Sequence, residues 1–414
     1  MTVFSPADIL LPKKAPFETW AVIACDQFTS QPEYWAQVRE TVQDRPSTLH
    51  LILPESELGN AGEPERIRQI HRTMLRYEQE DGFRCYENAL IYVERTLRSG
   101  AVRKGLIGRV DLEAYDYRPG AVSPIRATEK TVTERIPPRM RVRRRASIEL
   151  PHVILLCDDG EDVLIGPIAD EKDALVPLYD FELMQGGGHI RGWLVPEAQT
   201  AAFVRRMGAY EASVGEKYAD LDGVPMVFAV GDGNHSLATA KACYEEMKKL
   251  HPEQDFSDHP ARYALVELEN IHEDAQVFEP IHRVLTHTQP GELLDALRRT
   301  ACAPGGYPVS WVSGRERGTV YLDRSLSTLP VGVLQQFLDG YLASHPGQID
   351  YIHGDEVLES LSQAEGAIGF RLPPMEKRDL FRGVIADGAL PRKTFSMGHA
   401  QEKRYYLEGR RIQP

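Results

Sequence analysis

The sequence predicts an α+β fold with mixed sheets and flanking helices, and three observations support this prediction. Met226–Val230 is an apolar run typical of a buried strand, and a glycine-flanked turn connects it to a helical pattern that ends near Leu250. Strand and helix patterns alternate through the first third of the chain. From Gly291 onward the pattern is helix, two strands, helix and a final strand, which indicates a further α+β layer.

The length of 414 residues predicts two or three domains, because single hydrophobic cores rarely grow beyond about 250–300 residues. We place an N-terminal α/β domain at residues 1–120 and a central domain carrying the Asp-Gly-Asn-His turn at 121–288. A C-terminal α+β domain follows at 289–414. Hydrophobic residues make up 42% of the chain and charged residues 26%, as in ordinary globular proteins.

Hydrophobic patterning assigns the elements of the N-terminal third. Strands are predicted at Trp20–Cys25, Leu49–Leu53, Asn88–Leu97 and Gly105–Val110. Helices are predicted from Glu33 and over Glu63–Asp81, where apolar residues recur on one helical face.

An arginine-rich stretch covers residues 135–145. Arg139, Arg141 and Arg143 alternate with Met140 and Val142, so a strand here would present guanidinium groups on one face. In an acidic protein such a row suits an anionic ligand, because arginine binds phosphate or carboxylate through two parallel hydrogen bonds. The alternative is an edge strand protected by charge.

The remaining elements are short strands and helices. Strands are predicted at His152–Cys157, Arg262–Glu269, Phe278–Leu285, Val309–Val312, Thr319–Leu322 and Ala367–Leu372. Ala201–Val214 is predicted to be helical. Asp158–Gly160 reads as a hairpin turn, Gln185–His189 as a flexible linker or a lid, and the segment around Lys393 as a solvated C-terminal strand or a cover for a site.

The turn after Met226–Val230 is the strongest candidate site. Gly231 and Gly233 permit backbone angles that other residues avoid, and Asp232 or Asn234 can cap the following helix. A strand that passes through glycines into a helix directs free amides and a positive dipole end at one spot, which suits an anion. Asp232 and His235 place a carboxylate and an imidazole at the same spot. The alternative is a purely structural turn.

Composition excludes several classes of protein. The formal charge of −13 argues against binding nucleic acid by general electrostatic attraction. Five scattered cysteines without a Cys-x-x-Cys pair predict a reducing, cytoplasmic environment. No apolar run approaches the length of a membrane span, and no Walker or Gly-x-Gly-x-x-Gly fingerprint occurs.

Three motifs carry a resemblance that spans nearly the whole chain. They are Gly231-Asp232-Gly233-Asn234-His235-Ser236, Arg126-Ala127-Thr128-Glu129 upstream, and Ile281-His282-Arg283 downstream. In this order they resemble a bacterial family described as domain of unknown function 1015. The turn of that family is similar to the turn of free serine kinases in the ParB/sulfiredoxin superfamily. The resemblance implies a ParB/sulfiredoxin-like strand-turn-helix core and phosphoryl transfer to a small hydroxylated metabolite, with L-serine as the first candidate.

Phosphoryl transfer needs in-line placement, neutralised oxygens and a base near the attacking hydroxyl. Amides of Gly231–His235 would hold a phosphate of ATP, ADP or pyrophosphate, and His235 would contact the transferred group. Asp232 would bind Mg²⁺ or accept the hydroxyl proton, with Glu129 as the alternative base and Arg126 on a substrate carboxylate. Further candidates for binding phosphate or substrate are Thr128, Arg135, Asn234, Ser236, His282, Arg283 and Lys393.

Asn234 and Ser236 stand where the kinase-like pattern has a histidine and an arginine. Arg126, Arg135 or Lys393 would supply the missing cation. His282 has a structural alternative as a core histidine with satisfied hydrogen bonds.

Two other functions use the same candidate site. A hydrolase of phosphate esters or pyrophosphate would use water as the acceptor, and a regulatory module would bind nucleotide without turnover. We expect a small anionic metabolite as the partner, and a homo-oligomer is an open alternative.

Overall fold

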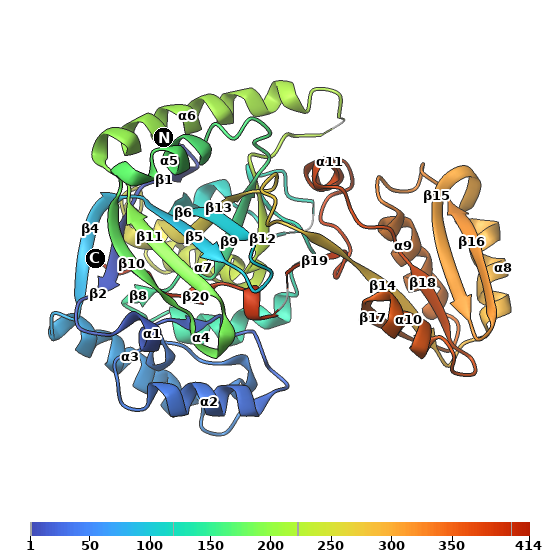
Figure 1. Ribbon diagram of the computed structural model, residues 1–414, viewed down its shortest axis with the longest axis horizontal. Coiled ribbons are helices and arrows are strands. Elements are labelled where there is room, and N and C mark those ends of the chain that lie inside the picture. The colour runs from blue at the N-terminus through green and yellow to red at the C-terminus, as the bar shows by residue number, and fades with distance from the viewer. Residues whose placement is uncertain (1, 119, 222, 399) are drawn as a thin grey trace.

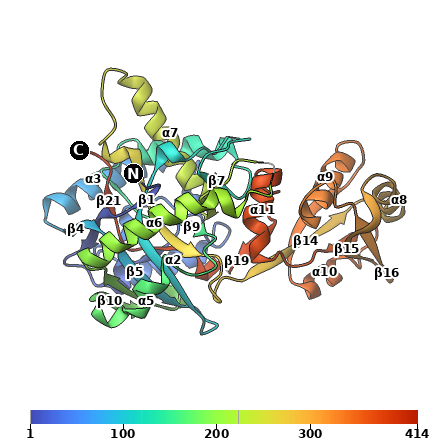
Figure 2. The same ribbon diagram turned by 90° about the horizontal axis from the view of Figure 1, so that it is seen from above.

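The computed structural model describes residues 2–118, 120–221, 223–398 and 400–414. It places a larger body beside a smaller one, and β14 (Phe278–Thr286) runs from the first into the second (Figure 1). The view from above shows the same two bodies, with α11 (Lys377–Asp387) between them (Figure 2). The predicted α+β class, with mixed sheets and flanking helices, is confirmed.

A large mixed sheet forms the centre of the larger body. Its strand order is β10-β11-β5-β6-β13-β9-β12-β7, with β1 also paired to β6. The strands of this body are β1 (Phe4–Ser5), β2 (Ala7–Pro12), β3 (Val22–Ile23), β4 (Phe83–Ala89), β5 (Ile91–Thr96), β6 (Val102–Asp111), β7 (Ile125–Ala127), β8 (Ile148–Glu149), β9 (Val153–Cys157), β10 (Val176–Glu182), β11 (His189–Leu194), β12 (Phe228–Asp232) and β13 (Tyr263–Asn270).

Helices cover both faces of this sheet (Figure 1). They are α1 (Phe17–Trp20), α2 (Pro32–Val42), α3 (Glu63–Gln79), α4 (Ile136–Arg143), α5 (Gly166–Asp170), α6 (Glu197–Lys217) and α7 (Asn234–Leu250). Successive residues of a strand point to opposite faces. Tyr92 of β5 therefore packs in one apolar core, whereas Ile91 and Val93 pack in another.

The smaller body is built on a second sheet, ordered β16-β15-β18-β14-β17, with β19 also paired to β14. Its elements are β14, α8 (Pro290–Thr300), β15 (Cys302–Ser313), β16 (Glu316–Leu322), α9 (Pro330–Leu342), β17 (Gln348–His353), α10 (Asp355–Leu361), β18 (Ile368–Arg371), α11 and β19 (Phe395–Met397). The chain then returns to the larger body, where β20 (Tyr405–Tyr406) pairs with β3 and β21 (Arg410–Arg411) pairs with β8.

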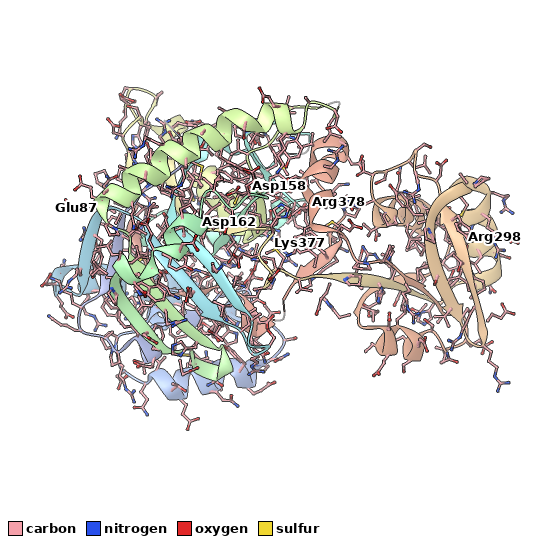
Figure 3. All side chains as sticks on the ribbon, turned by 45° about the horizontal axis from the view of Figure 1, so that its top comes forward. Glu87, Asp158, Asp162, Arg298, Lys377 and Arg378 are labelled. Atoms are coloured by element: carbon pink, nitrogen blue, oxygen red, sulfur yellow. The ribbon has the colours of Figure 1, made fainter. Side chains whose placement is uncertain are left out.

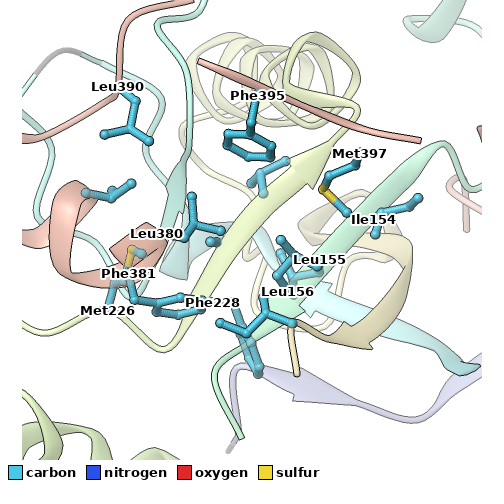
Figure 4. Packing of buried hydrophobic residues seen from close by; sticks show 14 of the residues in the cluster. Ile154, Leu155, Leu156, Met226, Phe228, Leu380, Phe381, Leu390, Phe395 and Met397 are labelled. Carbon is cyan, nitrogen blue, oxygen red and sulfur yellow. The ribbon is translucent and has the colours of Figure 1, made fainter. Parts of the chain in front are cut away.

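Polar and apolar contacts attach α11 to the larger body. Lys377 faces the region that carries Asp158 and Asp162 (Figure 3), and its Nζ donates to the Glu273 carbonyl at 2.5 Å. Figure 4 shows the apolar side of the same junction. There, side chains of α11 and β19 pack in the core that contains β9 and Phe228 of β12.

Two predicted strands in the N-terminal third differ from the structure. Leu49–Leu53 is not a strand, because residues 48–50 form a 3-10 helix and the chain then runs without regular pairing. Trp20–Cys25 is a strand only over Val22–Ile23, since Phe17–Trp20 forms α1. Apolar character identified these segments as buried, and it does not distinguish a strand from a buried turn.

The arginine row was predicted as a strand and is a helix, α4. Pro137 and Pro138 occupy its first turn, where proline needs no hydrogen-bond partner, and Ile136 and Met140 bury one face four residues apart. Its arginines bind acidic partners. They form the pairs Arg139–Glu55, Arg141–Glu63, Arg143–Glu149 and Arg144–Glu246.

Two predicted loops also have other roles. Asp158–Gly160 is not a hairpin turn, because β9 lies inside the sheet between β12 and β13 and the chain continues into α5. Gln185–Gly188 connects β10 to β11, two strands that pair antiparallel, so this segment closes a hairpin.

The predicted division at residues 120 and 288 stays a prediction. The larger sheet combines β5 and β6, which precede residue 120, with β9, β12 and β13, which follow it. Among the described residues, no helix combines the length and the apolar character needed to cross a bilayer.

Candidate functional site

The turn from β12 into α7 is a sharp elbow formed by Gly231–Ser236. Gly233 has a φ of +79° and occupies the N-cap position, and no side chain caps the helix there. The predicted capping by Asp232 or Asn234 is therefore wrong, because Asp232 Oδ1 instead accepts from the Gly233 N–H at 2.9 Å. Ser236 N–H bonds back to the Gly233 carbonyl at 2.9 Å. The two preceding amides, of Asn234 and His235, lie in the first turn and have no intrahelical acceptor.

Replacing Gly233 with alanine is expected to lower the free energy of unfolding by about 1–3 kcal/mol. A Cβ at Gly233 would lie 2.9 Å from Val153 Cα, and the residue would keep a left-handed backbone. Gly59 is the matched control, since it also has a φ of +79° but nothing within 4 Å of an added Cβ. Urea unfolding of both variants separates crowding from backbone strain. Equal losses would show that the elbow is not packed as tightly as described.

The elbow opens into a cavity of about 720 Å³, here called the elbow cavity. The larger body supplies the elbow itself, the loop after β3, residues 128–139 and the C-terminal segment around Lys403. The smaller body supplies Tyr351 and His353 of β17. The cavity therefore lies where the two bodies meet.

Most of the predicted site residues line this cavity. They are Thr128, Glu129, Arg135, Gly231, Asp232, Gly233, Asn234, His235, Ser236 and Lys393. Residues more than 250 positions apart in the sequence, such as Glu129 and Lys393, thus share one space.

Arg126, His282 and Arg283 are not among the residues that line the elbow cavity. Arg126 is buried, and its guanidinium binds the carbonyls of Ser123, Val224 and Pro225. These hydrogen bonds hold the chain just before β12, at the end of the strand opposite the elbow.

His282 and Arg283 lie in the smaller body and are buried there. His282 accepts from the Leu372 N–H at 3.2 Å, and its Nε2 lies 3.0 Å from Asp355. Arg283 donates to Gln335 at 2.8 Å, and its guanidinium lies over the ring of Tyr351, 4.7 Å from the centroid. These contacts hold both side chains inside the smaller body, although Arg283 Nη2 has no hydrogen-bond partner there.

Cations outnumber carboxylates among the described residues of the cavity wall. The cations are Lys130, Arg135, Arg139, Arg392, Lys393 and Lys403. The carboxylates are Asp26, Glu55, Glu129 and Asp232. In a chain with a formal charge of −13, a local excess of positive charge at a helix N-terminus creates an attractive potential for anions.

Lys403 is the cation closest to the acidic residue of the elbow. Its Nζ lies 3.4 Å from Asp232 Oδ2, and both side chains are largely buried. Asp26 lies elsewhere on the cavity wall, 3.2 Å from His152 Nε2. Burial alone would lower the pKa of His152, but the Asp26 carboxylate raises it well above the usual value. This pair is therefore a buried imidazolium beside a partly exposed carboxylate.

Glu129 is a half-buried carboxylate whose pKa lies above the usual value. Burial is the main cause and the negative charge of Asp232 adds to it, whereas the N–H and the charge of Lys393 oppose it. The Lys393 N–H donates to Glu129 Oε1 at 3.0 Å, and Lys393 has a φ of +59°. A carboxylate held this way suits a general base, because a raised pKa makes it a stronger proton acceptor once it is deprotonated. The neighbouring Thr128 hydroxyl donates to the Val230 carbonyl at 2.8 Å and so holds β7 to β12.

His235 is neutral at physiological pH. Burial lowers its pKa to about 4, and Arg139 and Arg135 add to the effect. Its Nε2 accepts from the Val132 N–H at 3.3 Å, which places the ring proton on Nδ1. His235 can therefore offer a hydrogen bond to a ligand but not a charge.

The cavity fits Mg²⁺ only if a phosphate ligand contributes oxygens. Among the described residues, no group of three or more His, Cys, Asp or Glu side chains could hold a metal ion. Magnesium in phosphoryl-transfer sites is commonly held by one or two carboxylates together with substrate phosphates. Asp232, with Glu129 nearby, provides that donor set.

Several residues of the cavity wall were not predicted from the sequence, and five of them bear on the argument. They are Asp26, Glu55, Tyr351, His353 and Lys403. Asp26 had a signal, because it follows a predicted strand in a polar turn, as Asp232 does. The other four carry no local motif and reach the cavity through long-range packing.

Comparison with solved structures gives distant similarities. SbnI with a C-terminal truncation, from Staphylococcus aureus, is 12% identical, with a TM-score of 0.36 and coverage of 70% of this chain and 83% of that chain. A free serine kinase in complex with AMP is 10% identical, with a TM-score of 0.37 and coverage of 74% and 90%. A conserved hypothetical protein from Pyrococcus furiosus is 9% identical, with a TM-score of 0.32 and coverage of 74% and 94%. With TM-scores below 0.5, none of these similarities assigns a function.

No curated protein matches the chain. The profile of the family described as "Protein of unknown function (DUF1015)" matches residues 6–408. Because this match spans nearly the whole sequence, the chain belongs to the DUF1015 family.

Proposed function

We propose that this chain is a phosphotransferase that moves a phosphoryl group from a nucleotide to a hydroxyl group of a small metabolite in the elbow cavity. L-serine is the first acceptor to test, because the sequence motifs resemble those of free serine kinases. The observation that carries the proposal is the position of the α7 N-terminus. Its free amides and the surrounding cations face the same space as the carboxylates Asp232 and Glu129.

Each part that phosphoryl transfer needs has a candidate in this cavity. The amides of Asn234 and His235 and the cations of the wall would bind the donor phosphates. Asp232 would hold Mg²⁺ together with those phosphates, and the bound ion would neutralise charge on them. Glu129 would accept the proton of the attacking hydroxyl, while His235 would donate from Nδ1 to a phosphoryl oxygen.

The assay that tests the proposal supplies ATP, ADP or pyrophosphate, labelled in the transferable phosphate, together with Mg²⁺ and small hydroxylated amino acids. Label on the acceptor supports the proposal. Label released only as inorganic phosphate would mean that water is the acceptor and the chain is a hydrolase. Binding of nucleotide without any turnover would instead support a regulatory module and contradict the proposal.

The pH dependence of transfer is expected to depend on Glu129. A general base acts when deprotonated, so kcat/KM should rise with pH through the pKa of Glu129, and the midpoint should lie above the usual value of 4.5. In the Glu129→Gln variant kcat/KM should no longer rise with pH in this range, and it should fall about a hundredfold. The rise of kcat/KM with pH should remain in His235→Gln, since the pKa of His235 is about 4 and its ring stays neutral over the pH range in which Glu129 titrates. A midpoint at or below 4.5 would contradict this assignment.

A further inference from the structure

A second cavity, here called the inner cavity, shares part of its wall with the elbow cavity. It has a volume of about 160 Å³, and Glu55, Arg139 and Ser236 line both cavities. The inner cavity also reaches Thr239, one turn further along α7 than Ser236. A ligand with phosphates at the elbow could therefore extend along the first turns of α7 into the inner cavity.

The wall of the inner cavity is mainly apolar. Leu51–Leu53, Met74 of α3 and Val142 of α4 are among its lining residues. Its charged residues already have partners, because Arg143 lies 2.6 Å from Glu149 and Arg139 pairs with Glu55. This environment favours an apolar group over a charged one.

One polar feature of the wall is the chain at Ile52–Leu53. Both residues are buried and belong to no helix or strand. Among the hydrogen bonds of the described residues, none involves the backbone of Ile52 or Leu53. Buried backbone groups are almost always paired, so a ligand with polar edges would satisfy them better than a hydrocarbon would.

The volume suits an aromatic ring. An apolar cavity of about 150 Å³ is large enough to bind benzene. We propose that the inner cavity binds the base of a nucleotide, with its ring faces against the apolar side chains and its polar edge toward Ile52–Leu53. The proposal rests on the proposed function, since it makes the donor a nucleotide and not pyrophosphate.

The shared wall then lies where the ribose of that nucleotide would be. Carboxylates commonly accept hydrogen bonds from ribose hydroxyls, and Glu55 provides one at this position. Arg139, which pairs with Glu55, also faces the elbow cavity and is close enough to His235 to lower its pKa. Arg139 would thus lie between the ribose and the phosphates of the bound nucleotide.

The test compares ligands with and without a base on a variant with a filled inner cavity. Val142 is only partly buried and lines the cavity, so Val142→Phe adds bulk without replacing a fully buried residue. Leu75→Phe is the control, because Leu75 is 51% exposed on α3, next to Met74. Isothermal titration with ADP and with pyrophosphate, each with Mg²⁺, measures the two affinities, and AMP and ribose 5-phosphate are titrated into the wild type in the same way. Near-UV circular dichroism and thermal unfolding verify the fold of each variant, and Leu150→Phe is the second filling variant.

In the wild type, AMP should bind at least about tenfold more tightly than ribose 5-phosphate, which has the same ribose and single phosphate but lacks the base. Filling the inner cavity should weaken ADP about tenfold and change pyrophosphate by less than about twofold. Leu75→Phe should change neither affinity.

Unchanged ADP affinity in both folded filling variants would overturn the base assignment and leave the proposed function standing. Unchanged ADP affinity with a raised KM for the acceptor would assign the inner cavity to the acceptor instead. If no phosphate compound binds to the wild type, the proposed function and the base assignment both fail.

Discussion

Replacing Asp232 with asparagine is expected to reduce phosphoryl transfer about a thousandfold while leaving the fold intact. The substitution keeps the size of the side chain and its Oδ1, which accepts from the Gly233 N–H at 2.9 Å, so the elbow keeps its shape. It removes the negative charge that would hold Mg²⁺ against the donor phosphates. Initial rates at saturating donor and Mg²⁺, together with thermal unfolding, measure both parts of the expectation.

Two comparisons isolate the role of the Asp232 charge. Asp258→Asn removes one negative charge from an exposed position outside the cavity, and its activity should match the wild type. Lys403→Met removes the partner that lies 3.4 Å from Asp232. If Asp232 served only to hold Lys403, both variants would lose the same activity. Retained turnover in a folded Asp232→Asn variant would remove Asp232 from the reaction.

The parts of the fold that were predicted correctly are those with a strong local pattern. The strand before the elbow, the helix after it, and the amphipathic helix over Glu63–Gln79 follow directly from apolar periodicity. Arg139, Arg141 and Arg143 show where such patterns fail. Their alternation also fits a helix whose arginines reach partners from several elements, and those partners are distant in sequence.

The composition of the elbow cavity was predictable only around the elbow itself. Asp232 and His235 follow a buried strand directly, so the sequence shows their common location. Arg126 appeared equally suitable, but its guanidinium binds carbonyls about 100 residues away and turns from the cavity. Lys403 reaches the cavity because the C-terminal segment returns across the larger body. Such long-range placement leaves no local signal.

A buried arginine, Arg95, holds the backbone of that C-terminal segment in place. The Arg95 guanidinium donates to the carbonyls of Gln401 at 2.6 Å, Glu402 at 3.0 Å and Lys403 at 2.5 Å, and also to Gly187 at 2.8 Å. Arg95 is only 2% exposed. Burial lowers its pKa to about 9, and repulsion from Arg103 adds to this effect, so Arg95 stays charged at neutral pH.

Arg95→Met is expected to lower the free energy of unfolding by at least about 3 kcal/mol, because four carbonyls, that of Gly187 in a buried hydrogen bond, lose a charged donor at once. Urea unfolding measures this loss. Arg98→Met is the matched control, since Arg98 is exposed and its Nε donates to the Gly186 carbonyl at 2.7 Å in the same hairpin. Its cost should stay below about 1 kcal/mol, as expected for an exposed polar contact.

The same substitution should also act on the elbow cavity through Lys403. Without Arg95 the backbone of residues 401–403 loses its anchor, so the Lys403 ammonium should no longer stay beside Asp232. At a temperature where the variant is folded, KM for the phosphate donor should rise about tenfold, and Lys403→Met should add little further effect in the double variant. Independent, additive effects of the two substitutions would show that Arg95 stabilises the fold without positioning Lys403.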